Sequence, residues 1–206
     1  ECAKDGPVLV YLVTEDWYFV SHRLPMALAA QSAELVSSEA ETLAAVRRIK
    51  DAGLWGVKFY TSMNPAWIAP AAAEAHRLGL RVLGHVPAGM RPLEAVQAGY
   101  DELTHINFVL MQAMPQSVVD VANTAARFEG PAEFGRTVDL DSPAMKAFIA
   151  ELAERRIWVD PTMVVFERSF NHDTPELGYT YAPFAGTLPV VFERGLAEGG
   201  YPLFGK

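Results

Sequence analysis

"GLWGVKFYTSMNPAWIAPAAAEAHRLGLRVLGHV" (residues 53–86) contains two short apolar segments with a longer helix-prone segment between them. The apolar segments, 55–60 and 81–86, are rich in β-branched and aromatic residues, which predicts two buried strands. Residues 65–79 predict a helix, although Pro70 should break or restart it. This strand–helix–strand order is typical of one unit of a parallel sheet.

The same alternation continues on both sides of this unit. Strands are predicted at 8–14, 101–108 and 157–166, helices at 26–35, 39–53, 91–99, 115–128 and 142–156, and a loop at 130–141. Apolar strands that alternate with helices predict a parallel sheet covered by helices on both faces. A closed (β/α)8 barrel usually needs about 250 residues and eight strands. We therefore expect an open α/β sheet or a partial TIM barrel.

Composition excludes several classes of partner. The chain has 206 residues, 50% hydrophobic and 20% charged, which predicts one globular domain, or one domain and a fragment. A net charge of −8 disfavours a nucleic-acid or anionic membrane surface, and no apolar run approaches the ~20 residues that span a bilayer. Cys2 is the single cysteine, which excludes a thiolate metal site. The sequence starts at Glu1 without a basic-then-apolar leader, so either a signal was removed or the chain is a piece of a longer one, and the compartment stays open. The oligomeric state also stays open.

Three polar residues occupy similar places on three consecutive predicted strands: Lys58, His85 and His105. Taken singly, a histidine near a strand end is more simply a hydrogen-bonded packing residue, and a lysine beside aromatic residues commonly extends its ammonium to water. However, the carboxyl ends of parallel strands meet at one edge of the sheet, where ligands bind. Two imidazoles without a thiol favour Zn, Mn, Ni or Fe over Mg or Ca. Together, the three residues predict a functional site.

"VKFY" (57–60) and "AAAEAHRLGLRVLGHVPAGMRPLEAVQAGYDELTHINF" (71–108) resemble the metal-dependent amidohydrolase superfamily, in the branch of imidazolonepropionases and prolidase-like enzymes. The likeness extends over about residues 38–206. It implies hydrolysis of a C–N bond in a small amide or peptide-like substrate by metal-activated water. It also implies a divalent metal, with Zn the first choice and Mn, Ni or Fe as alternatives.

The resemblance also implies roles for individual residues. Lys58 would be a carboxylated lysine bridging two metals, His85 and His105 would bind the second metal, and Tyr60 and Asn107 would line the substrate pocket. A lysine in an apolar environment has a lowered pKa, and the neutral amine can add CO2 to become an anionic oxygen ligand.

Two parts of the implied site have no counterpart in the sequence. The superfamily pattern includes a His-x-His pair on its first strand, and no His-x-His occurs here. It also includes an aspartate on the eighth strand, and the sequence reaches Lys206 before such a strand. Asp160 belongs to the preceding strand and does not take that role. We therefore assign no catalytic residue and expect a truncated domain that is inactive alone.

The beginning of the chain resembles a different family. "VLVYLVTEDWYFVSHRLPMALAA" (8–30) is similar to the first strand, loop and helix of GT-B glycosyltransferases of the group-1, family-4 kind. This predicts a glycosyltransferase-like β–α fragment at 1–36 joined to an incomplete amidohydrolase-like barrel domain at 37–206. A glycosyltransferase fragment and a non-catalytic gene remnant are therefore the alternative functions.

Overall fold

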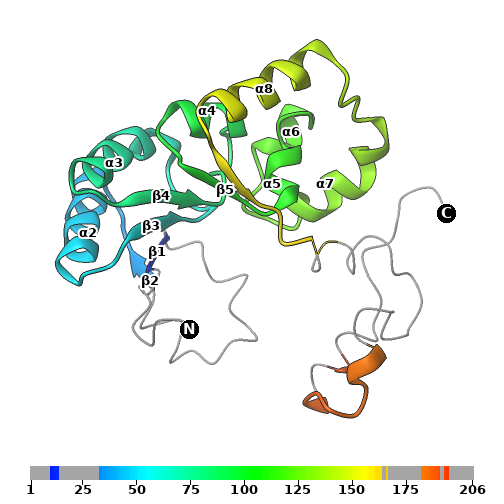
Figure 1. Cartoon of the computed structure of the whole chain (residues 1–206), viewed down its shortest axis with the longest axis horizontal. Coiled ribbons are helices and arrows are strands. Elements are labelled where there is room, and N and C mark those ends of the chain that lie inside the picture. The colour runs from blue at the N-terminus through cyan, green and yellow to red at the C-terminus, as the bar shows by residue number, and fades with distance from the viewer. Residues whose placement is uncertain (1–9, 14–32, 164–165, 167–181, 191–192, 195–206) are drawn as a thin grey trace.

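The computed structural model describes residues 10–13, 33–163, 166, 182–190 and 193–194. Its centre is a parallel sheet of six strands in the order β2-β1-β3-β4-β5-β6 (Figure 1). The strands are β1 (Val10–Val13), β2 (Ala33–Leu35), β3 (Gly56–Phe59), β4 (Arg81–Gly84), β5 (Glu102–Thr104) and β6 (Trp158–Asp160). The mixed α/β class and the parallel sheet predicted from the sequence are confirmed.

In the described chain, helices follow each of the strands β2 to β5. They are α2 (Glu39–Asp51), α3 (Pro65–Arg77), α4 (Pro92–Gln97), α5 (Ile106–Leu110), α6 (Gln116–Val119), α7 (Ala126–Phe134) and α8 (Pro143–Glu154), with 3-10 turns η2 (Gly135–Thr137) and η3 (Ala182–Phe184). Side-chain oxygens of Ser38, Asn64 and Ser142 accept backbone N–H groups at the starts of α2, α3 and α8. These caps satisfy N–H groups that have no partner inside the helix.

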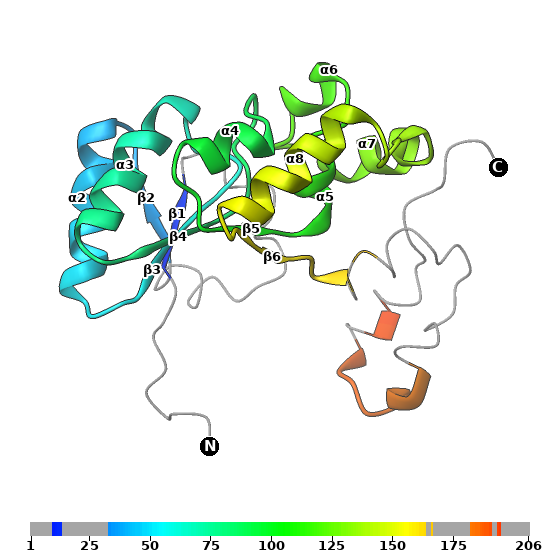
Figure 2. The ribbon, with the colours of Figure 1, turned by 45° about the horizontal axis from the view of Figure 1, so that its top comes forward.

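The main helices cover one face of the sheet. From β3 to β6, strands that follow one another in the chain are also neighbours in the sheet. Because right-handed connections that all advance in one direction stay on one side, the helices between these strands share a face. Figure 2 shows α2, α3, α4 and α8 together on that side. For the described residues, the expectation of helices on both faces is therefore wrong.

The hydrophobic core lies between these helices and the sheet. Val57 and Phe59 of β3 are fully buried there, as are Val82 of β4 and Leu103 of β5. Because side chains alternate along a strand, Lys58 lies on the opposite face of the sheet from Val57 and Phe59. The sheet register aligns Lys58 with Leu83 and Glu102 in one row across β3, β4 and β5.

Several strand and helix predictions were wrong in their limits. Residues 33–35 form β2 and not the end of a helix, and the strand predicted at 101–108 ends at Thr104. The strand predicted at 157–166 likewise ends at Asp160. His105 follows β5 with a φ of 69°, a backbone conformation that ends the strand before α5.

After α5, the predicted limits of helix and loop were also wrong, because the helix predicted at 115–128 is interrupted between α6 and α7. Residues 115–128 hold α6 and the start of α7, and α7 extends into the predicted loop at 130–141. In α3, Pro70 lies inside one continuous helix. Packing of the buried residues Ile68 and Ala72 holds this helix together, which outweighs the hydrogen bond that proline removes.

The first strand belongs to the same sheet as the rest. β1 pairs in parallel with β2 and with β3, where Val10 lies opposite Val57 and Tyr11 opposite Lys58. Most of the segment 8–30 lies outside the described residues, so the division at residues 36 and 37 stays a prediction. Within the described ranges, no helix is both long and apolar enough to cross a membrane.

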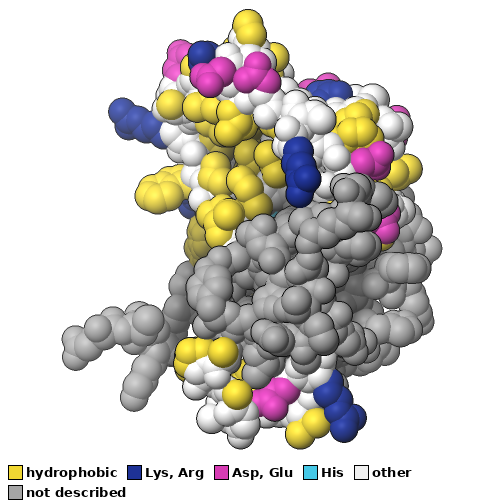
Figure 3. Space-filling view, turned by 90° about the vertical axis from the view of Figure 1, so that its right-hand side faces the viewer, with side chains coloured by type: hydrophobic (Ala, Val, Ile, Leu, Met, Phe, Trp, Pro, Cys, Tyr) yellow, Lys and Arg dark blue, Asp and Glu magenta, His cyan; other side chains and the backbone are white. Residues whose placement is uncertain are grey.

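The β6 end of the sheet is less covered than its centre. All four residues of β3 are buried, whereas all three of β6 are exposed, with Trp158 67% exposed. Met163 and Phe184 are also large exposed hydrophobic residues. Figure 3 shows hydrophobic side chains exposed on this side of the molecule, next to atoms that are not described.

Candidate functional site

Lys58 is held in the sheet by its neighbours on β3. Its side chain is only 9% exposed, so it does not extend freely into water as an isolated lysine beside aromatic residues commonly does. Burial lowers the pKa of the Lys58 ammonium, while the carboxylates of Asp160 and Glu102 oppose this shift. A larger share of Lys58 is therefore a neutral amine than of a lysine in water.

His85 follows the last residue of β4 and lies against aromatic rings. Its ring centroid is 4.2 Å from that of Tyr60 and 4.7 Å from that of Phe108. The His85 side chain is 6% exposed, and its Nδ1 has no hydrogen-bond partner among the described residues. Burial, followed by the positive charges possible on His105 and Lys58, holds the pKa of His85 well below its usual range. His85 is therefore a neutral imidazole at pH 7.

His105 lies beside His85, at the end of the neighbouring strand. The two ring centroids are 4.7 Å apart in an edge-to-face arrangement. Burial and then the Lys58 charge lower the pKa of His105 to about 4, against a smaller opposing effect of Asp160. A neutral imidazole is the form that binds metals. The structure thus brings the two predicted histidines together in the state that a metal site requires.

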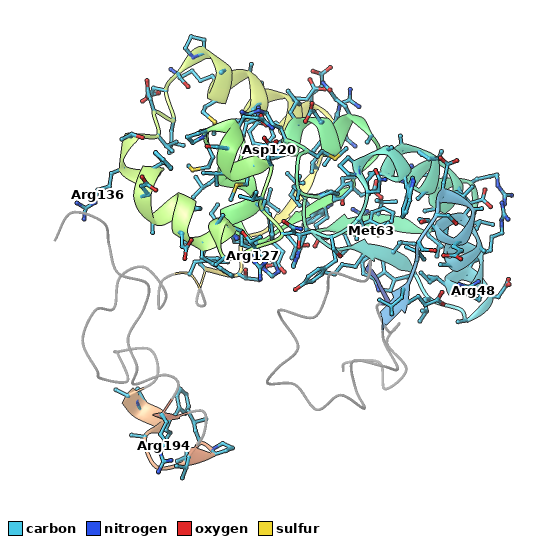
Figure 4. The ribbon with its side chains drawn as sticks, turned by 180° about the vertical axis from the view of Figure 1, so that it is seen from behind. Arg48, Met63, Asp120, Arg127, Arg136 and Arg194 are labelled. Carbon is cyan, nitrogen blue, oxygen red and sulfur yellow. The ribbon has the colours of Figure 1, made fainter. Side chains whose placement is uncertain are left out.

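Arg127 of α7 adds positive charge near both rings. Its guanidinium further lowers the pKa of His85 and of His105. Figure 4 shows Arg127 on the side of α7 that lies close to the ends of the strands. No pattern in the sequence pointed to Arg127, because it lies on a helix outside the strand repeat.

The two predicted pocket residues have different surroundings. Tyr60 is in ring contact with His85, whereas Asn107 is buried in α5, where its amide nitrogen donates to the Arg127 carbonyl oxygen over 3.0 Å. The amide oxygen of Asn107 has no partner among the described residues. Tyr60 therefore adjoins the candidate site, while Asn107 is tied to the backbone of α7.

Two carboxylates near Lys58 were not among the predicted site residues: Glu102 and Asp160. Glu102 shares the row of Lys58, and burial followed by the charge of Asp160 raises its pKa. Asp160, which ends β6, acts on the pKa of Lys58, Glu102 and His105. Leu103 belongs to the core, like Val57 and Phe59. Alternation along the strand would therefore have placed Glu102 on the opposite face, which is the face of Lys58.

The described residues fit a metal in part. They supply two neutral imidazoles, and one of these carries a buried ring nitrogen without a partner. Among the described residues, however, no three side chains of His, Cys, Asp or Glu are grouped to hold a metal ion.

This chain spans about half or less of the length of the solved structures that it matches. No family model and no curated protein matches this sequence. Among solved structures, the chain is similar to an uncharacterized protein, at 15% identity and a TM-score of 0.43, over 79% of this chain and 50% of that one. It is also similar to an amidohydrolase, at 15% identity and a TM-score of 0.37, over 65% of this chain and 40% of that one. The third is an A. niger ochratoxinase, at 12% identity and a TM-score of 0.40, over 93% of this chain and 51% of that one.

Proposed function

We propose that this chain is part of a metal-dependent hydrolase of the amidohydrolase type that acts on C–N bonds. The observation that carries the proposal is the pair of neutral imidazoles of His85 and His105, with centroids 4.7 Å apart beside the buried Lys58. The resemblance of residues 57–60 and 71–108 supports the same class.

His85 and His105 would hold one divalent metal through ring nitrogens, with Zn the first choice and Mn, Ni or Fe as alternatives. Lys58 would complete the ligand set as a carbamate: its neutral amine adds to the carbon of CO2 and loses a proton, which leaves an anionic group with two oxygens. The lowered pKa of Lys58 favours this reaction because it increases the share of neutral amine. A bound metal would supply a Lewis acid for the substrate carbonyl and activate water.

The arrangement of the strands supports a partial barrel over residues 37–206. From β3 to β6 the strands follow one another in order, and their helices lie on one face, as in a (β/α)8 barrel. The face that carries Lys58 would then be the barrel interior. Tyr60, in contact with His85, would line the pocket for a small amide or peptide-like substrate, and Asn107 would lie behind it.

A second candidate is a chain without catalytic activity. It is favoured by one observation: among the described residues, no group of three metal-binding side chains is assembled. Lys58 would then remain an ammonium whose charge is balanced by Glu102 and Asp160. The glycosyltransferase alternative depends on residues 8–30, of which only 10–13 are described.

Metal content tests the proposal directly. We would load wild type, His85→Ala and His105→Ala with Zn and bicarbonate, remove loosely bound metal by gel filtration, and measure the remainder by mass spectrometry. The matched control is His76→Ala, because His76 lies on α3 and its ring contacts Asp101 outside the site. We expect wild type and the control to retain Zn and the two site variants to lose it. Equally low Zn in all four proteins would support the non-catalytic alternative.

Turnover is a separate question from metal binding. A protein that retains Zn would be tested on a panel of simple amides and dipeptides, with His105→Ala as the inactive reference. Hydrolysis by wild type alone would establish the activity. Zn retention without hydrolysis would show a metal site that needs further residues to act.

A further inference from the structure

Two residues in unusual backbone conformations are joined by one side-chain hydrogen bond. His105 has a φ of 69° and Thr162 a φ of 45°, and only Arg156 shares a positive φ among the described non-glycine residues. The Nδ1 atom of His105 lies 2.6 Å from Oγ1 of Thr162. A positive φ is a true outlier for a β-branched residue such as threonine, and strain of this kind clusters at functional sites.

The same turn also holds the backbone of both residues. The His105 N–H donates to the Asp160 carbonyl oxygen over 2.6 Å, and the Ile106 N–H donates to the Pro161 carbonyl oxygen over 3.1 Å. The Asp160 side chain accepts from the Thr162 N–H over 3.1 Å. Residues 160–162 therefore fix where His105 lies and how the Thr162 hydroxyl approaches it.

A hydrogen bond to one ring nitrogen of histidine determines the role of the other. In the neutral ring one nitrogen carries the proton and the second carries a lone pair. Histidines that bind metals commonly donate the proton of the nitrogen that does not bind the metal to an oxygen atom. Oγ1 of Thr162 is such an oxygen and lies 2.6 Å from Nδ1. If it accepts the Nδ1 proton, Nε2 of His105 is the nitrogen that carries the lone pair.

We infer that Thr162 is the positioning residue for His105: its hydroxyl oxygen accepts the Nδ1 proton, orients the ring and keeps Nε2 available as a metal ligand. The purpose of this arrangement rests on the proposed function, but the tautomer itself does not. Thr162 lies two residues after β6 in a conformation that is unfavourable for threonine, and the proposed role of its hydroxyl gives a reason for threonine at this position. Glycine or asparagine would adopt the same backbone with less strain but would not place that hydroxyl.

The tautomer can be measured in the metal-free protein. We would label the histidine rings with 15N and record NMR spectra of the full chain at pH 8, well above the pKa of about 4 of His105. The His105 signals would be assigned by their absence from His105→Gln. We expect wild type to carry the proton on Nδ1. A proton on Nε2 in wild type would overturn the inference without any variant of Thr162.

Variants of Thr162 then test its role. Thr162→Val keeps the side-chain shape but removes the hydroxyl, so the proton should move toward Nε2, and Thr162→Ser should restore the wild-type tautomer. The control is Thr104→Val, because the buried Thr104 hydroxyl has no partner among the described residues. An unchanged tautomer in Thr162→Val, or an equal change in Thr104→Val, would contradict the inference.

Zn affinity gives a second readout. Loss of a hydrogen bond to the second ring nitrogen of a metal-binding histidine typically lowers metal affinity by about 10- to 100-fold. Thr162→Val should therefore lower the Zn affinity by that factor, and Thr162→Ser by less. The two proposals fail differently. A protein with the Nδ1 tautomer that binds no Zn would refute the proposed function alone, whereas a protein that binds Zn with the Nε2 tautomer would refute only the role of Thr162.

Discussion

The rings of His85 and His105 meet edge to face at the ends of neighbouring strands, with their centroids 4.7 Å apart. Each ring contributes to the burial of the other, and the Lys58 charge lowers the pKa of both. Burial first, and then the neighbouring positive charges, favour the neutral form of both imidazoles. The arrangement therefore determines how the protein responds to acid.

Stability should fall as pH drops below about 6.5. The pKa of His105 is lowered to about 4 in the folded chain, and burial also holds the pKa of His85 well below its usual range, whereas both rings have ordinary values once unfolded. The unfolded chain therefore binds more protons between about pH 6.5 and 4, so the stability present above 6.5 is lost as the pH falls through this window.

Urea denaturation at several pH values checks this prediction. The free energy of unfolding of wild type should decrease from pH 7.5 to pH 5. The decrease should be smaller in His105→Gln, because glutamine takes up no proton. A wild-type free energy that is constant over this range would show that the histidines are not held neutral.

Lys58→Met should stabilise the fold or leave its stability unchanged while abolishing any site that depends on CO2. Burial lowers the pKa of Lys58 despite two nearby carboxylates, so the ammonium is less stable here than in water. Burial outweighs the attraction of Asp160 and Glu102 in the pKa of Lys58, so removal of the ammonium should cost the fold little stability. Thermal melts at neutral pH measure this effect.

Lys58→Arg is the matched variant for the chemical role of Lys58. Arginine keeps the positive charge but remains protonated, so it cannot form a carbamate. Wild type incubated with 13C-bicarbonate and Zn should show a carbamate NMR signal that both Lys58→Arg and Lys58→Met lack. A signal that persists in either variant would place the carbamate on another amine.

Gly84→Ala should be severely destabilising, by more than about 3 kcal/mol. Gly84 has a φ of 131°, and an added Cβ would collide with the backbone carbonyl oxygen and nitrogen of Phe59 on the neighbouring strand. The His85 N–H donates to that same carbonyl oxygen, so the collision would also displace His85.

Gly53→Ala is the control for Gly84→Ala. Gly53 also has a positive φ, 75°, but an added Cβ there would meet nothing within 4 Å. Chemical denaturation should show a loss of about 1 kcal/mol for Gly53→Ala, from backbone strain alone. Equal losses in the two variants would indicate that the close approach of β3 and β4 does not matter.

Tyr100→Phe should destabilise the protein by about 1 to 2 kcal/mol. The buried Tyr100 hydroxyl donates to the His85 carbonyl oxygen over 2.8 Å, and phenylalanine would leave that carbonyl without this donor. Because this hydrogen bond holds the backbone of His85, its loss should lower the Zn affinity as well as the stability. A variant that melts like wild type would show that water replaces the hydroxyl.

The sequence was informative where the structure is local and periodic. The strands at Gly56–Phe59 and Arg81–Gly84, and the helix between them, follow from the spacing of apolar residues. The meeting of His85 and His105 also follows, because parallel strands bring their carboxyl ends to one edge. Limits such as the end of β5 before His105 do not follow, since a positive φ at histidine depends on the turn that holds it.

By itself, then, the sequence determined the α/β class, the order of the central elements and the edge at which three titratable residues gather. Only the tertiary structure decided that the main helices share one face of the sheet, that Glu102 and Asp160 act on Lys58, and that Thr162 binds His105. The physical reason is the separation along the chain of the residues that interact. Periodicity records which side of its own strand or helix a residue occupies, whereas the contact between His105 and Thr162 joins residues from two separate strand ends.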